Sequence, residues 1–278
     1  MKLVSYEVAG RPDIGLVVGA GVVALGERLG CVDLKSALPR LGEIESLSGQ
    51  KPDHSIEDIQ FLPPIPNPER ILCIGLNYMT HLRETGREPP AKPMVFTRFA
   101  SSQVGHLRPL LRPRVSEQFD FEGELAVVIG RECHYVEPGD AMSVIAGYSC
   151  YNDGSIRDWQ RHSTQFSPGK NFPRSGSFGP YLVTPDEIAD IRACSLVTRL
   201  NGMEMQRAVI GDLVFDIPAL IAYCSSFTSL SPGDVIVTGT TGGVGAFRKP
   251  PVWMKPGDTV EVEIAGVGTL TNSIEDEV

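Results

Sequence analysis

The stretch DFEGELAVVIG, residues 120–130, determines most of the fold and the site that we expect from this chain. Its second half is rich in Val and Ile and ends at a glycine, which is typical of a buried β-strand. Side chains two residues apart lie on the same face of a strand, so we expect Glu122 and Glu124 to lie side by side. Neighbouring carboxylates repel each other, and a hard divalent cation with oxygen ligands usually offsets that repulsion.

Asp153 is the candidate for a third metal ligand. It follows a second short apolar run, residues 143–151, and stands in the sequence Asn-Asp-Gly-Ser, residues 152–155. On these residues alone, two interpretations stay open. The three carboxylates hold a divalent cation, or the two glutamates lie on a half-exposed strand face and Asp153 forms an Asx turn.

The bulk composition is that of an ordinary globular protein, since 42% of the 278 residues are hydrophobic and 21% are charged. The formal net charge is −9 and no basic run occurs. We therefore expect no nucleic-acid partner, because neutralising phosphates requires clustered Lys and Arg. The chain shows neither a signal-peptide pattern nor a long apolar run, so we expect a cytoplasmic protein without a membrane partner.

The six cysteines are scattered along the chain and form no Cys-x-x-Cys pair. This spacing argues against a zinc site and, in a reducing compartment, against disulfides. Cys73 and Cys150 stand in apolar surroundings, where a thiol has a raised pKa and is inert. We expect the cysteines to be small buried residues without a catalytic role.

A proline-rich connector separates two expected domains. Residues 62–68, LPPIPNP, contain four prolines, which exclude both a helix and an interior strand. Residues 1–64 alternate short strands with a short helical segment and carry no chemical motif, so we expect a small N-terminal α/β domain. Residues 65–278 form the larger domain, which carries every candidate site residue.

The larger domain is expected to contain many short strands and few helices. One clear helix is predicted at residues 217–226, with Asp216 as its N-cap. Residues 163–179 are rich in Ser, Gly and Pro, and we expect an irregular segment there. The fold class is therefore α+β and predominantly β. The expected strands cover residues 70–75, 94–99, 120–130, 143–151, 196–200, 204–206, 235–238, 259–264 and 268–273.

A polar segment, residues 77–87, carries His81 and Glu84. Their i, i+3 spacing places the two side chains on one face if the segment is helical. Glu84 could then orient His81 as a general base, although the same spacing also suits an ordinary surface pair. Residues 85–93 contain one glycine and three prolines, loop chemistry that could let the helical piece move as a lid.

Two further groups of residues could bind an anion. Lys170, Arg157 and Gln160 could contact an anionic substrate, or they are plain surface residues. Residues 238–245, TGTTGGVG, follow an apolar strand, and their backbone amides and hydroxyls could hold a carboxylate. This loop lacks the Gly-Lys-Ser/Thr ending of a P-loop and the helix of a Rossmann turn, which disfavours a nucleotide site.

The chain resembles the fumarylacetoacetate hydrolase family over roughly residues 65–274. Any one of the matching segments would be weak, but their common order along the chain makes the resemblance specific. The segments are GLNY (75–78), HLRE (81–84), KP (92–93) with Phe96, DFEGELAVVIG (120–130), NDGSIRDWQ (152–160) with Lys170, LSPGDVI (230–236) and TGT (238–240).

The resemblance implies a mixed β-sandwich roll of the kind found in that family, preceded by a small N-terminal domain and usually assembled as a homodimer. It also implies a bound Mg²⁺ or Mn²⁺ ion and a mobile lid. The residues implied are the metal ligands Glu122, Glu124 and Asp153, a His81–Glu84 dyad on the lid, Lys170 near the metal, and Thr240 at the substrate carboxylate.

The sequence departs from the family pattern at two places. Thr241 stands where the family commonly has a proline, and residues 211–214, GDLV, replace a more usual run containing Thr and Met. We expect both departures to affect which substrate binds more than they affect metal binding.

The residues and the resemblance together suggest a metal-dependent hydrolase of a 2,4-dioxo acid. His81, supported by Glu84, would activate a water that attacks the 4-oxo carbon, and the products would be pyruvate and a carboxylic acid. Fumarylpyruvate or maleylpyruvate, from aromatic catabolism, is the preferred substrate. The candidate catalytic residues are His81, Glu84 and Lys170, and Lys170 would also contact the substrate. The other candidate substrate-binding residues are Gln160, Thr240, Arg157 and Arg98.

Two alternatives remain on the sequence alone. An isomerase or decarboxylase of 2-oxo acids, of the oxaloacetate or 2-hydroxymuconate type, would use the same metal site without an attacking water. A non-catalytic β-rich module with a structural cation would explain the carboxylates. That module would leave His81, Glu84 and Lys170 without a role.

Overall fold

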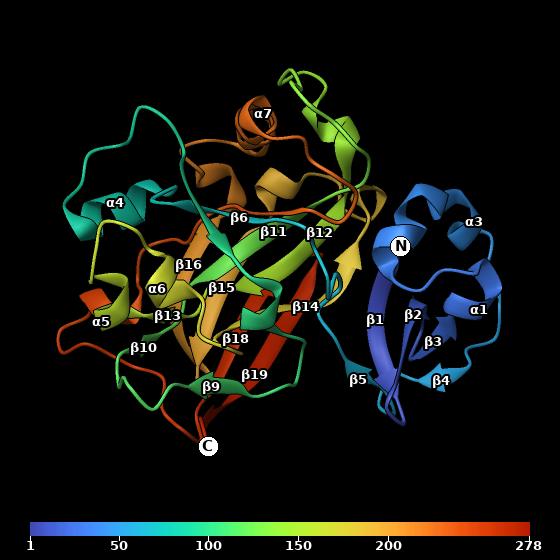
Figure 1. Cartoon of the computed structure of the whole chain (residues 1–278), viewed down its shortest axis with the longest axis horizontal. Helices are drawn as coiled ribbons and strands as arrows, with labels where there is room; N and C mark the ends of the chain where they lie inside the picture. The colour runs from blue at the N-terminus through green and yellow to red at the C-terminus, as the bar shows by residue number, and fades with distance from the viewer.

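Two β-sheets packed against each other form the body of the structure, a computed structural model that describes residues 1–278 (Figure 1). The larger sheet has twelve strands. Ten of them run in the spatial order β4 (His54–Ser55), β3 (Gly21–Ala24), β2 (Arg11–Val18), β1 (Lys2–Val8), β14 (Gly176–Val183), β12 (Ile145–Asn152), β11 (Gly123–Ile129), β17 (Val235–Val237), β6 (Ile71–Gly75) and β7 (Met94–Arg98), while β5 (Gln60–Phe61) pairs with β1 and β8 (Gln103–Val104) with β14.

The smaller sheet has five strands, and a separate pair of short strands lies beside it. The five strands run in the order β16 (Met203–Val209), β15 (Ser195–Leu200), β18 (Thr259–Ile264), β19 (Gly268–Asp276) and β9 (Leu110–Arg112). The separate pair is β10 (Phe119–Asp120) with β13 (Ser155–Ile156).

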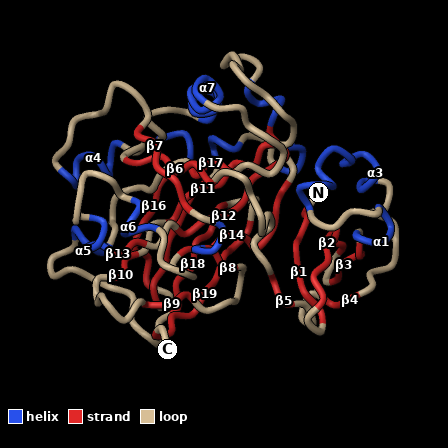
Figure 2. The backbone as a smooth tube through the Cα atoms, in the orientation of Figure 1, coloured by secondary structure: helices blue, strands red, loops and turns tan.

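Helices are short and lie around the sheets (Figure 2). The α-helices are α1 (Gly26–Leu29), α2 (Leu34–Ala37), α3 (Leu41–Glu45), α4 (Met79–Thr85), α5 (Arg157–Gln160), α6 (Ser167–Lys170) and α7 (Ile217–Phe227). The 3₁₀ turns are η1 (Leu38–Arg40), η2 (Ala100–Ser102), η3 (Ala141–Val144), η4 (Pro185–Glu187), η5 (Ile191–Ala193), η6 (Ile210–Asp212) and η7 (Gly245–Phe247). None of these helices is both long enough and apolar enough to cross a lipid bilayer.

Strand β11 is buried on both faces, which explains the unbroken apolar run in the sequence. Leu125 and Val127 point into the core shared with the smaller sheet and α7, whereas Ala126 and Val128 point into the core on the opposite face. Each large aliphatic side chain buried in this way contributes about 1.5–3 kcal/mol to folding. The strand that carries the glutamates is therefore anchored from both sides.

The first 64 residues extend the larger sheet. Strand β1 pairs with β14 antiparallel through Lys2 with Val183 and Leu3 with Leu182. Figure 1 shows this unit, in blue, at one side of the body. Its residue Leu16 belongs to the same core cluster as Val128 of β11. The division of the chain at residue 64 stays a prediction.

The predominantly β architecture expected from the sequence is confirmed, and so are the helix at α7 and its N-cap, because Asp216 Oδ1 accepts a hydrogen bond from Ala219 N–H at 2.9 Å. Burial also raises the pKa of Cys150 to about 12, in line with an inert thiol. The six cysteines are free, and three of them are only partly buried.

The expectation of an irregular segment over residues 163–179 is wrong in two places. Residues 167–170 form α6, and β14 begins at Gly176 in the middle of the larger sheet. The pairing of β14 with β12 shifts between Cys150 and Tyr148, so Pro180 falls in a bulge where no ladder hydrogen bond requires its missing N–H. The pairing partners come from distant parts of the chain, which composition does not reveal.

The expected single strand over residues 120–130 is interrupted. Strand β10 ends at Asp120 and pairs with β13, whereas β11 begins at Gly123 and pairs with β12. Phe121 and Glu122 form the bend between them. Asp153 lies in the matching bend between β12 and β13, and its N–H donates to the Glu122 carbonyl at 2.8 Å. Two paired bends therefore bring the first and third carboxylates together.

Candidate active site

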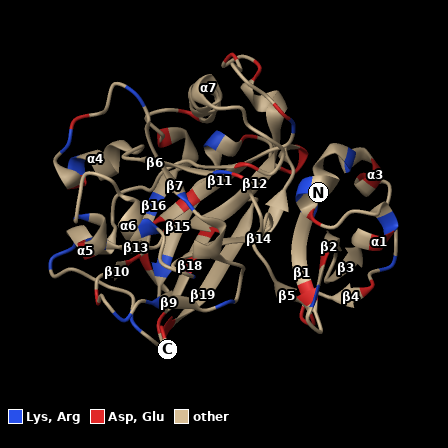
Figure 3. Ribbon diagram, viewed as in Figure 1, with Lys and Arg blue, Asp and Glu red and all other residues tan.

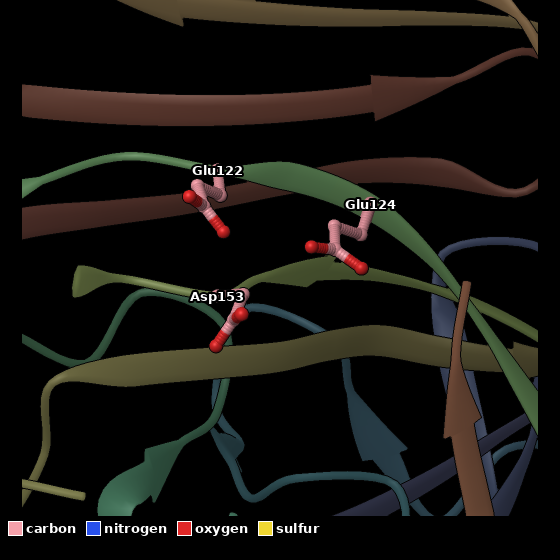
Figure 4. Close-up of side chains that lie close together, drawn as sticks. All are labelled: Glu122, Glu124 and Asp153. Carbon is pink, nitrogen blue, oxygen red and sulfur yellow. The ribbon is translucent and has the colours of Figure 1, made fainter. Parts of the chain in front are cut away.

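Glu122, Glu124 and Asp153 converge on one point (Figure 4). One carboxylate oxygen of each lies within 4.8 Å of the other two, and all three side chains are buried. The Glu122 N–H donates to the Asn152 side-chain oxygen at 3.0 Å, which fixes the bend that carries this residue. Three oxygen donors at this spacing suit a hard divalent cation, so the predicted grouping of these residues is found in the structure.

Buried cations surround two of the three carboxylates. Lys170 Nζ lies 2.7 Å from Glu122 and 2.5 Å from Asp153, and Arg157 Nη2 lies 2.6 Å from Glu122. Arg98 Nη1 approaches the other oxygen of Asp153 at 2.6 Å. Figure 3 shows ribbon segments of basic residues, in blue, and of acidic residues, in red, beside α6 and β13. Burial raises the pKa of Glu122, but Arg157 and Lys170 outweigh it and hold that pKa at about 2.

Glu124 differs from the other two because no basic side chain pairs with it. Its carboxylate accepts one hydrogen bond, from the Gly239 N–H at 2.5 Å. Burial and the charges of Asp153 and Glu122 raise the pKa of Glu124 well above its usual range. No positive charge therefore compensates the ionised form of the Glu124 carboxylate. A divalent ion bound between the three carboxylate oxygens would supply that charge. The donor set therefore fits Mg²⁺ or Mn²⁺.

Glu122 and Glu124 form the floor of a cavity of about 480 Å³. Gln160, Arg157, Lys170 and Thr240 line it together with Glu122 and Glu124, and His81 lies on the side formed by α4. Apolar side chains complete the wall, namely Ile74, Leu76, Met94, Phe96, Phe166 and Phe247.

His81 and Glu84 form the expected pair on one face of α4. His81 Nδ1 lies 3.1 Å from Glu84 Oε2, and Glu84 Oε1 accepts a hydrogen bond from the Gly243 N–H at 3.1 Å. When Nδ1–H donates to the carboxylate, Nε2 of the same ring is left as an acceptor. The pair therefore has the arrangement of a general base held by an orienting carboxylate. The ring of Phe247 stands edge-on to His81, with centroids 6.1 Å apart.

Contacts near its start hold α4 in place beside the cavity. At its start, the buried Asn77 side chain donates to the carbonyls of Phe215 at 3.0 Å and Thr238 at 2.8 Å. Farther along, the hydroxyls of Thr80 and Thr241 lie 2.9 Å apart. Thr241 is the residue that replaces the proline common in the family, so this contact depends on that departure. The mobility of the lid stays a prediction.

Thr240 lines the cavity, but its hydroxyl is already occupied. Thr240 Oγ1 donates to the Gly123 carbonyl at 3.0 Å and accepts from the Gln206 amide at 2.8 Å. The backbone N–H of Thr240 has no hydrogen-bond partner in the protein. The group that Thr240 can offer to a substrate carboxylate is therefore this N–H rather than the hydroxyl.

The remaining candidate substrate-binding side chains fall into two groups. Arg157 and Gln160 line the cavity and are joined by a hydrogen bond of 2.9 Å. Arg98 is fully buried outside the lining, where it donates to Asp153, to the Gly154 carbonyl and to the Ser175 hydroxyl. The structure therefore places Arg98 behind a metal ligand and away from a substrate.

Asp120 supports the site in a way that the sequence did not indicate. Its carboxylate accepts from Arg157 Nε at 2.8 Å and from the N–H groups of Gly245 at 2.7 Å and Ala246 at 2.9 Å. Asp120 thus holds both the Arg157 side chain and the turn that carries Phe247. Its place directly before the two glutamates was the only signal available, because the partner turn is over a hundred residues away.

Comparison with known proteins identifies the family. The family described as fumarylacetoacetate (FAA) hydrolase, C-terminal, matches residues 70–275. The chain belongs to the fumarylacetoacetate hydrolase family. Its resemblance at the sequence level is thus confirmed over most of the chain.

Individual members of the fumarylacetoacetate hydrolase family match nearly the whole chain. The mitochondrial oxaloacetate tautomerase FAHD2A of Bos taurus is 38% identical over 295 residues, covering 99% of this chain and 91% of its own. The fumarylacetoacetate hydrolase of Exiguobacterium antarcticum is 31% identical with a TM-score of 0.85, and 100% of each chain is covered.

One solved member of the family contains a metal. Maleylpyruvate hydrolase from Sphingobium sp. SYK-6, in complex with manganese(II) and pyruvate, is 26% identical with a TM-score of 0.83 and covers 100% of both chains. This member and the acidic cluster of the present chain both point to a divalent metal site. The family includes hydrolases and tautomerases, which points to an enzyme.

Proposed function

We propose that this protein is a divalent-metal-dependent enzyme that acts on a 2-oxo acid through its enolate. One observation carries the proposal: of three converging buried carboxylates, Glu122 and Glu124 line a cavity that is also lined by His81, the partner of Glu84. When bound, the divalent cation would act as a Lewis acid that stabilises negative charge on the 2-oxo group. Glu122, Glu124 and Asp153 would hold it.

Oxaloacetate is the first candidate substrate, and keto–enol interconversion is the first candidate reaction. The tautomerase relatives support it, and those of Bos taurus and Rattus norvegicus cover 99% of the chain. In this reaction His81 Nε2 would take a proton from carbon 3, and a proton would be delivered to the 2-oxo oxygen, so that no bond other than C–H and O–H changes. Glu84 would stabilise the imidazolium that forms.

The remaining cavity residues would bind and orient the substrate. Burial lowers the pKa of Lys170, but Asp153 and Glu122 outweigh it and raise that pKa, so the side chain is a charged donor and unsuited as a base. Arg157 and Gln160 would contact substrate oxygens. The free N–H of Thr240 would hold the carboxylate beside the 2-oxo group.

Hydrolysis of an acylpyruvate such as fumarylpyruvate or maleylpyruvate is the second candidate reaction. The ordered His81–Glu84 pair favours it, because such a pair can deprotonate water. Water would add to carbon 4, the bond between carbons 3 and 4 would break, and carbon 3 would gain a proton to give pyruvate. A place in aromatic catabolism and a cytoplasmic location belong to this second candidate and stay predictions.

One set of assays tests both candidates. The protein, treated with EDTA and reloaded with Mg²⁺ or Mn²⁺, is incubated with oxaloacetate while the ultraviolet absorbance of the enol is followed. It is then incubated with fumarylpyruvate and maleylpyruvate while pyruvate release is measured with lactate dehydrogenase. Metal-dependent enol conversion without pyruvate release supports the tautomerase. Metal-dependent pyruvate release from an acylpyruvate supports the hydrolase, and activity on neither substrate class contradicts the proposed function.

We also propose that the protein assembles as a homodimer, as the family resemblance implies. Light scattering coupled to size-exclusion chromatography measures this directly. A mass near twice 30.1 kDa supports the proposal, and a mass near 30.1 kDa contradicts it.

A further inference from the structure

Gln206 lies fully buried in β16 and extends its amide toward the start of β11. Its Oε1 accepts a hydrogen bond from the Gly123 N–H at 2.9 Å, and its Nε2 donates to Thr240 Oγ1 and to the Thr241 carbonyl, both at 2.8 Å. The partners determine the orientation of the amide, because an N–H requires the oxygen and a carbonyl requires the nitrogen. All three bonds would be lost if the amide were removed.

The bonds of Gln206 to Gly123 and to Thr240 close a ring with one further hydrogen bond. Thr240 Oγ1 donates to the Gly123 carbonyl at 3.0 Å, so both polar groups of the Gly123 backbone are bound, one by Gln206 and one by Thr240. Strand β17, which pairs with β11 from Ala126 to Val128, ends before it reaches Gly123. The Gln206 amide therefore takes the place of a backbone peptide group where the ladder stops.

Gly123 lies between the two metal-binding glutamates, and its neighbours leave no room for a side chain at this position. A Cβ added to Gly123 would lie 2.0 Å from Thr198 Oγ1. The ring thus ties the backbone between Glu122 and Glu124 to the loop of Thr240, a residue that lines the cavity and whose N–H has no partner in the protein. It uses the Thr240 hydroxyl in doing so, which leaves that N–H as the free donor.

We propose that Gln206 is a positioning residue that sets the distance between the metal-binding strand and the Thr240 loop, and thereby the affinity for the substrate carboxylate. Gln206 does not line the cavity, so it acts through Gly123 and Thr240. The inference rests on the proposed function, in which the Thr240 N–H holds that carboxylate. It assigns a specific task to a residue that no motif in the sequence indicated.

Gln206→Met tests the proposal, because methionine has nearly the same volume and none of the three hydrogen bonds. We expect KM for the turned-over 2-oxo acid to rise about tenfold, while kcat changes less than about threefold, since the loss of a carboxylate contact weakens binding without altering the proton transfer. The Kd for Mn²⁺, measured by calorimetry without substrate, should also change less than about threefold. Glu122 and Asp153 keep their other backbone contacts.

Asn272→Leu is the matched control, since it removes a buried amide of β19 that bonds the Gly105 and Arg108 carbonyls away from the cavity. It should lower the thermal stability while leaving KM unchanged. Gln206→Glu keeps the acceptor for the Gly123 N–H and should lie between the methionine variant and the wild type in KM. If the wild type is active and Gln206→Met leaves KM unchanged, the proposal is wrong.

Hydrogen exchange of the metal-free protein gives a readout that does not depend on activity. Gln206→Met should raise the exchange of peptides covering residues 119–126 and 236–244, and Asn272→Leu should not. If the wild type converts no 2-oxo acid while exchange rises in both segments, the proposed function fails and the structural link through Gln206 stands. Unchanged exchange in both segments would remove that link.

Discussion

At the scale of single residues, two glutamates that are two positions apart have opposite electrostatic surroundings. Glu122 is paired with Arg157 and Lys170, whereas Glu124 has only the Gly239 N–H. The sequence could predict that both lie at one site, because a strand places alternate side chains together. It could not predict the pairing, because Arg157 and Lys170 reach Glu122 through the fold of α5 and α6.

Replacing each glutamate by glutamine should therefore affect the metal-free protein differently. Glu122→Gln removes one of the two carboxylate partners of Arg157 and of Lys170, which keep Asp120 and Asp153, and should destabilise the protein by about 1–3 kcal/mol. Glu124→Gln removes a repelled carboxylate and should leave the metal-free protein as stable or more stable. Both variants should weaken Mn²⁺ binding at least about tenfold. Thermal unfolding in EDTA and calorimetric titration with Mn²⁺ measure the two effects, and equal melting temperatures for both variants would contradict this account.

His81→Ala should separate chemistry from metal binding. The loss of a general base lowers kcat by about 10²–10⁴-fold, while Mn²⁺ affinity should stay at the wild-type value because His81 is not among the three ligands. Glu84→Gln, which keeps the shape of the orienting side chain, should reduce kcat less than His81→Ala. Turnover of His81→Ala at the wild-type rate would exclude this histidine as the base.

At the scale of elements, α4 was predictable and its attachment was not. The spacing of His81 and Glu84 predicted that both side chains share one face if the segment is helical, and the structure contains this helix with the two side chains in contact. Its contacts with the loop after β17 join residues about 160 positions apart, such as Thr80 and Thr241. A local sequence pattern cannot predict a contact between residues so far apart in the chain. For the same reason, no local pattern predicted the place of β14 in the larger sheet.

Thr241→Val should loosen α4, because it removes the hydroxyl that contacts Thr80. A lost hydrogen bond of about 1 kcal/mol should lower kcat/KM about fivefold and raise hydrogen exchange in residues 78–87. Thr228→Val, at the end of α7 and outside the cavity lining, is the control and should leave both quantities unchanged. If exchange in α4 does not rise, the hydroxyl contact does not hold the helix.

At the scale of the whole molecule, His106 joins the first 64 residues to the smaller sheet. Its Nδ1 accepts a hydrogen bond from the Thr271 N–H at 3.0 Å, and its ring stands edge-on to Phe61 with centroids 4.9 Å apart. Burial lowers the pKa of His106 to about 4. The folded protein therefore keeps this ring neutral at a pH where an unfolded chain would protonate it.

Stability should consequently fall as the pH drops from about 6.5, the ordinary histidine pKa, to about 4, because the unfolded chain binds a proton that the folded chain does not. His106→Gln keeps a hydrogen-bond acceptor without this titration. Its melting temperature should decline less than that of the wild type between pH 7 and pH 5, by a few degrees. Parallel melting curves across this range for the two proteins would argue against a neutral buried His106.

The ring around Gly123 has a consequence for how this scaffold can acquire new specificities. The floor of the site has little room for a change at Gly123, because an added Cβ would lie 2.0 Å from Thr198 Oγ1 and the neighbouring side chains would have to shift. The opposite rim consists of exposed loop residues, among them Arg87, Arg161 and Ser163, which no packing constrains in the same way. Libraries that seek altered substrate choice are best directed at this rim, where natural divergence of substrate choice should also have accumulated.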